Sequence, residues 1–311
     1  MQKRALTLVV FIVISVASLC QQERQYTFVR YGTDKGLSAY EITSVIQDDD
    51  GFIWAGTVSG LQRFDGTRFI TFRHNAEDPF SLPENNIRQI VRDSNRNLWI
   101  LTNSGHIGTF DTRNFKFKKA AVQPGRSVSL LQEKKLFTDS RGNVFLVCFR
   151  SELLTYNKDS NSFSPAHNFI HMPPKWPVIG LSEAKATGKY YIGTDSGLVV
   201  FNSKTKKISY SGHNTEQEAV IQHMGHILFT TPVLIDSKQR LWFFNWHPAG
   251  GGPYIHCFDL LRNRTVLMKY DFAPLIKEYH EPAGMLEQRN GTIWIRGGNI
   301  FARYIEKTNS F

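Results

Sequence analysis

Short runs of alternating apolar and polar residues recur along the chain from residue 42 onward. In the first unit these runs lie at residues 42–47, 52–57, 61–64 and 68–72. The Asp-Gly pair Asp50-Gly51 separates the first run from the second, and Asp65-Gly66 separates the third from the fourth. Gly supplies the positive φ that hairpin turns require. Alternation with a period of two residues is typical of half-buried strands. The pattern therefore predicts four short antiparallel strands in this unit.

The same unit repeats six times. Segment Ile42–Trp54 aligns with Ile87–Trp99, and extending this frame places one large aromatic residue in each unit, at Trp54, Trp99, Phe145, Tyr191, Trp242 and Trp294. These aromatics are 45, 46, 46, 51 and 52 residues apart, and the units are predicted to begin near residues 42, 87, 131, 178, 230 and 282. In four of the six units Gly stands three residues before the aromatic, and in four of six Asp stands six residues before it. We expect the six aromatic side chains to be buried between neighbouring sheets.

A four-stranded sheet that recurs at this spacing is typical of a β-propeller blade, whereas a β-helix repeats in far fewer residues per turn. The sequence thus predicts an all-β fold, a β-propeller of four-stranded antiparallel blades in one domain over residues 21–311. The sixth unit reaches Phe311 before its outer strand is complete, and Tyr26–Tyr31 resembles an outer strand without inner strands. Pairing that segment with the blade of Trp294 would close a six-bladed ring. A seven-bladed ring, represented here only in part, is the alternative.

The first unit resembles a known repeat family. The stretches Phe28–Ser38, Ile42–Thr57 and Ser59–Gly66 are similar to the two-component regulator propeller repeat. This resemblance implies the N-terminal periplasmic sensor region of a hybrid histidine kinase of the Bacteroidetes type, which signals to a kinase module across the inner membrane. It also implies a glycan or a glycan breakdown product as the ligand. The kinase modules of such receptors do not fit into 311 residues, so we expect no enzymatic activity from this chain itself.

The first twenty residues resemble an export signal. Lys3 and Arg4 precede the apolar run Leu6–Ile14, and small residues follow. A membrane anchor would need about 20 apolar residues. We therefore predict a signal peptide over residues 1–20 and a periplasmic location. Cys20 gives a second interpretation, lipid attachment, although Leu19 stands where such a site requires a small residue.

Composition narrows the class of protein. With 41% apolar residues, 21% charged residues, 23 Gly and 12 Pro, the chain is not disordered, collagen-like or a coiled coil. The formal charge of +10 is scattered without a run of five basic residues, so we expect no nucleic-acid partner. Cys148 and Cys257 lie in apolar runs and are expected to be buried free thiols rather than a disulfide framework.

Motifs for catalysis, metals or cofactors are not evident. Asp48–Gly51 has the composition of a calcium loop. An EF-hand, however, needs ligand residues at alternate positions, and this segment breaks that pattern, so an Asp-Gly turn explains it better. His223 and His226 lack a third ligand nearby in sequence. Gly250–Gly252 lacks the Lys-Ser/Thr ending of a phosphate loop. We therefore predict no catalytic residue, no metal and no cofactor.

Departures from the repeat provide the candidate ligand site. The fifth unit has about six extra residues between Trp242 and Phe258 compared with the first unit. Insertions in repeat folds map to loops on one face, often the binding face, although a neutral loop is the alternative. Aromatic planes and a histidine suit a sugar ring, so we predict ligand binding by Trp246, His247, Tyr254 and Trp176.

Two functions follow from these observations. The preferred one is a non-catalytic periplasmic sensor for an oligosaccharide or another small molecule. The alternative is a secreted propeller lyase or glycosidase whose active site is carried by loops and lacks a linear motif. The sequence leaves open whether the chain forms a homodimer.

Overall fold

A computed structural model describes residues 27–125, 133–246, 254–270, 272 and 278–311. The predicted signal peptide lies outside these residues. The chain divides into two parts, Met1–Leu37 and Ser38–Phe311. In the described residues of the first part, the one regular element is the 3-10 helix η1 (Thr33–Lys35). Residues 27–32 form no strand, so the prediction of a closing outer strand at Tyr26–Tyr31 is wrong for the residues described.

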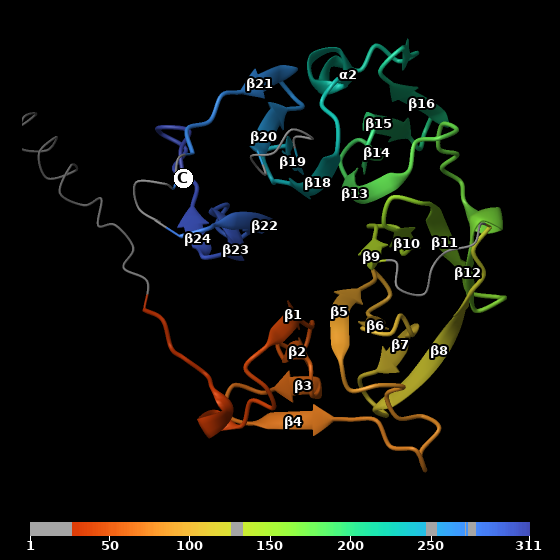
Figure 1. Cartoon of the computed structure of the whole chain (residues 1–311), viewed down its shortest axis with the longest axis vertical. Coiled ribbons are helices and arrows are strands. Elements are labelled where there is room, and N and C mark those ends of the chain that lie inside the picture. The colour runs from red at the N-terminus through yellow and green to blue at the C-terminus, as the bar shows by residue number, and fades with distance from the viewer. Residues whose placement is uncertain (1–26, 126–132, 247–253, 271, 273–277) are drawn as a thin grey trace, which may run out of the picture. The chain divides into compact units, whose positions relative to one another are not determined.

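Each repeat of Ser38–Phe311 forms an antiparallel sheet (Figure 1). Unit one contains β1 (Ile42–Gln47), β2 (Ile53–Thr57), β3 (Gly60–Phe64) and β4 (Phe69–Phe72). Unit two contains β5 (Ile87–Arg92), β6 (Leu98–Thr102), β7 (Ile107–Asp111) and β8 (Lys116–Val122). Unit three contains β9 (Lys134–Thr138), β10 (Val144–Cys148), β11 (Leu153–Asn157), β12 (Ser162–Ser164) and the 3-10 helix η2 (Pro165–His167).

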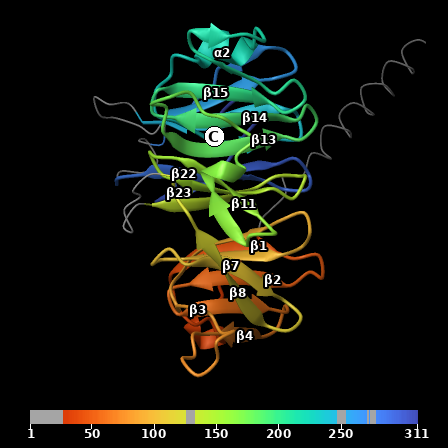
Figure 2. The same ribbon diagram turned by 90° about the vertical axis from the view of Figure 1, so that its right-hand side faces the viewer.

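The remaining units are less regular. Unit four contains β13 (Val178–Ala184), β14 (Lys189–Thr194), β15 (Gly197–Asn202), β16 (Lys207–Tyr210) and β17 (His213–Asn214), and Figure 2 shows β13, β14 and β15 side by side. The helix α2 (Ala219–Met224) leads into unit five, with β18 (Thr230–Ile235), β19 (Arg240–Asn245), β20 (Tyr254–Asp259) and β21 (Arg264–Val266). Unit six contains β22 (Glu281–Glu287), β23 (Ile293–Gly298) and β24 (Ile300–Arg303). The predicted all-β class of antiparallel sheets is confirmed.

A hydrogen bond accounts for the recurring six-residue spacing between Asp and the aromatic residue. In unit two, Asp93 Oδ1 accepts hydrogen bonds from the backbone N–H groups of Asn95 and Asn97, both at 2.9 Å. Its Oδ2 accepts the Trp99 indole N–H at 3.0 Å. The Trp54–Asp48 bond at 2.7 Å repeats this arrangement. One carboxylate thus closes the first hairpin and satisfies a buried indole, which explains why Asp recurs six residues before the aromatic.

Unit three solves the same problem differently, because Phe145 has no N–H to donate. Asp139 Oδ2 there accepts the hydroxyl of Tyr190 at 2.6 Å, and Tyr190 belongs to unit four. Burial, and after it this bond, raises the pKa of Tyr190 above its usual value. The turn carboxylate therefore links two sheets where the aromatic residue of its own sheet cannot bind it.

All six aromatics of the repeat are buried on the second strands of their sheets, which confirms the prediction. Their exposed fractions are 0% for Trp54, 2% for Trp99, 0% for Phe145, 3% for Tyr191, 0% for Trp242 and 8% for Trp294. Trp54 packs in one cluster with Ile87 and Ile90 of the next unit. Trp99, Phe145, Tyr191 and Trp242 likewise lie in clusters that span two units, so these five rings hold neighbouring sheets together through apolar burial.

Side chains also join the inner strands of units one to three. Thr43 Oγ1 on β1 donates to the Ile87 carbonyl of β5 at 2.6 Å. Gln89 on β5 bonds both backbone groups of Leu136 on β9, donating to its carbonyl at 2.9 Å and accepting its N–H at 2.8 Å. Inner strands of different sheets do not pair through their backbones here, so these side chains satisfy groups that would otherwise lack partners.

We expect Gln89→Ala to lower the free energy of unfolding by about 1–3 kcal/mol, because it leaves two backbone groups of Leu136 without their partner. Urea denaturation of the wild type and the variant measures this loss. Gln222→Ala, on an exposed position of α2, is the matched control and should change the free energy little. An equal loss in both variants would contradict the role given to Gln89.

Among the described residues, the outer edges of neighbouring units pair in two places. Strands β8 and β12 run parallel and join units two and three into one eight-stranded sheet. Lys269 likewise forms a parallel bridge with Ser310, which joins unit five to unit six. An equivalent tyrosine–asparagine hydrogen bond lies beside each contact. Tyr156 donates to Asn161 at 2.9 Å, and Tyr304 donates to Asn309 at 2.7 Å. Ser310 and Phe311 thus occupy the position at which an outer strand of unit six begins.

The helix α2 was not predicted. It lies in the longer connection between units four and five, and its Val220, Ile221 and Met224 are buried against β15 and β19 residues of one cluster. None of the helices among the described residues is long and apolar enough to span a bilayer. Cys148 and Cys257 are buried and free, as predicted, and burial raises the pKa of Cys148 to about 11.

Candidate functional site

The predicted ligand residues of unit five lie at one end of the β19–β20 hairpin. Trp246 directly follows β19, and Tyr254 begins β20 opposite Asn245. Trp246 is 43% exposed and Tyr254 is 42% exposed, whereas every residue of β19 is buried. His247 lies outside the described residues. The hairpin therefore presents two aromatic side chains to solvent at the end of a buried strand.

Polar groups lie on the same two strands as these aromatics. Asn245 is buried, and its Oδ1 lies 2.6 Å from Nε2 of His256 on the neighbouring strand. The His256 ring stacks on Phe243 with centroids 4.9 Å apart. Burial, and to a lesser degree the nearby His226, lowers the pKa of His256 to about 4. The imidazole is thus neutral at pH 7, and its Nε2–H can donate to Asn245, which fixes the amide beside the aromatic pair.

The fourth predicted residue, Trp176, lies on the connection between β12 and β13. It is half-buried and packs on Tyr210 with ring centroids 4.9 Å apart. A cavity of about 550 Å³ beside it is also lined by Arg150, His171 and Asp195. Trp176 therefore contributes to a surface of unit four, whereas Trp246 belongs to unit five.

Topology relates the two tryptophans. Val178, at the start of β13, pairs with Thr194 at the end of β14, and Thr230, at the start of β18, pairs with Asn245 at the end of β19. Trp176 precedes the start of an inner strand, and Trp246 follows the end of a second strand. Both therefore lie at the same end of their respective sheets. The structure brings Trp246 and Tyr254 together on one hairpin and leaves Trp176 on the neighbouring sheet.

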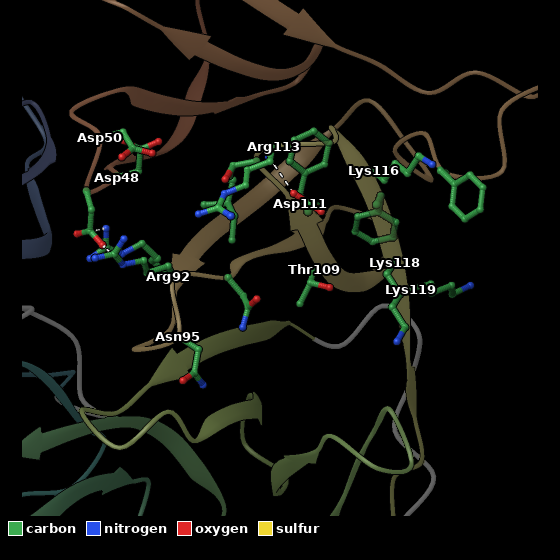
Figure 3. A pocket seen from close by; sticks show the side chains of 18 of the residues that line it. Asp48, Asp50, Arg92, Asn95, Thr109, Asp111, Arg113, Lys116, Lys118 and Lys119 are labelled. Atoms are coloured by element: carbon green, nitrogen blue, oxygen red, sulfur yellow. Dashed lines mark hydrogen bonds and ion pairs between the residues drawn. The ribbon is translucent and has the colours of Figure 1, made fainter.

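A further cavity lies at the opposite end of units one and two and was missed by the sequence analysis. Figure 3 shows its lining, and its volume is about 810 Å³. Asp49 there pairs with Arg92 at 2.6 Å and with Arg96 at 2.9 Å. These ion pairs tie the first turn of unit one to unit two. Arg96 stands where four of the six units have Gly, but nothing in the sequence shows that it pairs with Asp49 of the preceding unit, so the cavity was not predicted.

Metal binding has no evident site in the described part of the chain. No group of three or more His, Cys, Asp or Glu side chains there is arranged to hold an ion. Asp48 accepts bonds from the Phe52 N–H and the Trp54 indole, so the candidate calcium loop is occupied by its own turn. His223 Nδ1 lies 2.8 Å from the carbonyl oxygen of Ala219 within α2.

Comparison with known proteins identifies the repeat. The family model described as two component regulator propeller matches residues 36–59 and 81–104. These segments contain the first hairpins of units one and two, where the sequence resemblance was strongest. The chain carries two-component regulator propeller repeats. Its remaining units keep the same buried aromatic position, as the structure of units three to six demonstrates.

Solved structures resemble this chain over most of its length. Two are extracellular domains of proposed hybrid two-component systems from B. thetaiotaomicron. The domain of BT3049 has a TM-score of 0.58 and 18% identity over 91% of this chain and 37% of that chain. The domain of BT4673 has a TM-score of 0.61 and 18% identity over 86% of this chain and 35% of that chain. At such identities the likeness concerns the fold.

Two further relatives widen the comparison. PorZ, a surface component of the type-IX secretion system of Porphyromonas gingivalis, has a TM-score of 0.53 and 13% identity over 83% of this chain and 37% of that chain. "Histidine kinase P4" of Formosa agariphila is 37% identical over 65 residues, which are 21% of this chain and 5% of that protein. The chain thus spans little more than a third of each of these solved structures and a small part of the kinase.

Proposed function

We propose that the chain is the ligand-sensing propeller of a two-component receptor and that it works outside the cytoplasm. The observation that carries this proposal is the match of units one and two to two-component regulator propeller repeats. The fold likeness to extracellular domains of such systems supports it. The apolar leader Leu6–Ile14 supports export. In this proposal a kinase module on the other side of the inner membrane receives the signal.

The ligand in this proposal is an oligosaccharide that stacks on Trp246 and Tyr254. Two exposed aromatic rings at one hairpin end offer planar apolar surface of the kind that the C–H face of a sugar ring covers. Asn245 and His256, on the same two strands, are held by their mutual bond and supply polar groups beside Tyr254. Sites of this kind combine apolar lining with a few placed polar groups. Trp176 extends the surface onto unit four.

The Trp246→Ala variant tests the position of the ligand. Loss of one stacking ring should weaken oligosaccharide binding about 10-fold, since an aromatic contact of this kind is worth about 1 kcal/mol or more. The melting temperature should stay within about 1 °C, because the ring is 43% exposed and adds little to the core. Isothermal titration with maltotetraose, xylotetraose and tetragalacturonate measures the binding, and differential scanning calorimetry measures the melting.

Leu261→Ala is the matched control for this experiment. Leu261 is 68% exposed and follows β20 at the other end of the same sheet, so its loss should leave binding unchanged. A fall in the melting temperature of Trp246→Ala as large as that of a core truncation would contradict the proposed role. So would unchanged affinity in Trp246→Ala, and absence of binding by all three glycans would contradict a saccharide sensor.

A further inference from the structure

A third cavity, of about 540 Å³, is lined mainly by the inner strands of units one, two, three and six. Residues of β1, β5, β9 and β22 contribute to it, and Arg296 reaches it from β23. None of the predicted ligand residues lines this cavity. It therefore differs from the hairpin site of unit five in both position and composition.

The charged residues of this inner-strand cavity are strongly unbalanced. Four cationic residues line it, Arg88, Lys134, Lys135 and Arg296, against the single carboxylate of Glu133. That carboxylate bonds to the Arg88 guanidinium at 2.8 Å. The formal charge of the lining is +3. The inner strands β13 and β18 of units four and five carry no basic residue, so the basic residues of the inner strands lie on units two and three.

The fold makes room for one of these cations. Gly284 on β22 pairs with Arg296 on β23, next to an irregularity in the pairing between Pro282 and Gly284. A Cβ atom at Gly284 would stand 3.3 Å from three atoms of the Arg296 guanidinium. The guanidinium therefore lies directly over the glycine. A larger residue at position 284 would push it out of this position.

Lys135 experiences the accumulated charge. The surrounding protein lowers the pKa of its ammonium group, Glu133 opposes this change, and Arg296 and Arg88 lower the pKa further. Its Nζ lies 5.9 Å from the centroid of the Phe137 ring on the same strand. Water still reaches the side chain, which keeps an exposed surface. The charged form of Lys135 is less favoured here than in water, and a bound anion would reduce the repulsion from Arg296 and Arg88.

Apolar side chains complete the lining. Ile42 is 44% exposed, Val45 is 56% exposed and Leu286 is 43% exposed, although each lies on an inner strand. Exposed aliphatic groups beside clustered cations fit a ligand that has both an apolar face and anionic substituents. A sugar ring bearing carboxylate or sulfate groups has this combination.

We propose that the inner-strand cavity binds the anionic groups of an acidic oligosaccharide, one that carries carboxylates or sulfates. The proposal rests on the proposed sensor function for the saccharide and on the four cations for the charge. Guanidinium groups bind such oxyanions through paired N–H donors, and clustered cations raise the local concentration of an anionic ligand. The affinity then decreases with added salt, because ions screen the interaction.

Titration of the full chain with four probes tests the proposal. Tetragalacturonate supplies carboxylates, sulfated maltotetraose supplies sulfates, maltotetraose supplies the same backbone without charge, and sodium sulfate supplies the anion alone. We expect at least one charged tetrasaccharide to bind about 10-fold more tightly than maltotetraose at 50 mM salt, and to lose that advantage at 500 mM salt.

Two charge-removing variants locate the binding. Lys135→Gln and Arg296→Gln should each weaken binding of the charged tetrasaccharide about 10-fold, which corresponds to about 1.4 kcal/mol. Lys158→Gln is the matched control, since this exposed lysine follows β11, lines none of the three cavities and its loss removes the same charge. The melting temperature of Lys135→Gln should equal or exceed that of the wild type, because the variant removes like-charge repulsion.

The outcomes separate this proposal from the sensor function. Equal binding of charged and neutral tetrasaccharides, with loss in Trp246→Ala, overturns the acidic ligand and leaves the sensor in place. Binding by none of the three tetrasaccharides overturns both proposals. Equal loss in Lys158→Gln shows attraction to the general surface charge and overturns the cavity site. Sodium sulfate binding as tightly as the charged tetrasaccharide assigns the cavity to a free anion and overturns the saccharide class.

Discussion

Asp236→Ala is expected to lower the free energy of unfolding by about 3–5 kcal/mol, since the change breaks a buried ion pair on one side only. Asp236 is 2% exposed. Its Oδ2 accepts the Arg240 Nε–H at 2.6 Å and the Trp242 indole N–H at 2.8 Å. Its Oδ1 accepts the backbone N–H groups of Lys238 and Arg240. The variant leaves these four donors without their acceptor.

Glu306 limits the damage without removing it. This carboxylate accepts from Arg240 at 2.7 Å, but its side chain is 44% exposed and it cannot reach the turn that Asp236 closes. Guanidinium chloride denaturation followed by tryptophan fluorescence measures the loss. Asp159→Ala is the control, because Asp159 is exposed in the β11–β12 turn and should matter little. A loss below about 1 kcal/mol in Asp236→Ala would be that of an ordinary surface position and would refute the argument.

Trp99→Ala should also cost about 3–5 kcal/mol, here through an apolar cavity between units two and three. The ring is 2% exposed and meets Tyr156 and Phe163 of unit three edge-on, with centroids 4.6 and 5.5 Å apart. Its indole N–H is bound by Asp93. Truncation therefore removes inter-sheet packing and a hydrogen bond together.

Two further substitutions separate these contributions. Trp99→Phe keeps most of the ring and loses only the donor to Asp93, so it should cost about 1–3 kcal/mol. Trp246→Ala removes the same side chain from an exposed hairpin and should cost far less. Equilibrium denaturation of the three variants measures the order. Similar losses in Trp99→Ala and Trp246→Ala would mean that the aromatic position of the repeat is not a core position.

Local periodicity predicted much of this fold because each repeat carries its own constraints. The turn Asp and the aromatic six residues later bind each other, so both recur, and strand ranges such as Ile42–Gln47 could be located closely. The strand expected at Tyr26–Tyr31 failed for the opposite reason. A strand needs a partner edge, and alternation of residue types does not specify one.

Contacts between units were beyond the sequence. Lys135 and Arg296 are ordinary single cations in their own repeats, and only the arrangement of inner strands brings them to one cavity. The same holds for Gln89 and Leu136, since the sequence does not indicate which backbone groups a glutamine side chain on a strand will bind. The candidate hairpin was found because Trp246 and Tyr254 flank an insertion, which is a departure that sequence alone records.

The parallel contact of β8 with β12, and its counterpart at Lys269 and Ser310, sets which parts of the protein open together. Amide protons of units two and three share one hydrogen-bonded sheet, so they should exchange with deuterium as one cooperative block. Units three and four are not joined in this way through their outer strands. One bridge, between Ser151 and Val178, links these two units. They are expected to open more independently of each other than units two and three, and a ligand that spans the seam beside Trp176 would slow exchange on both sides.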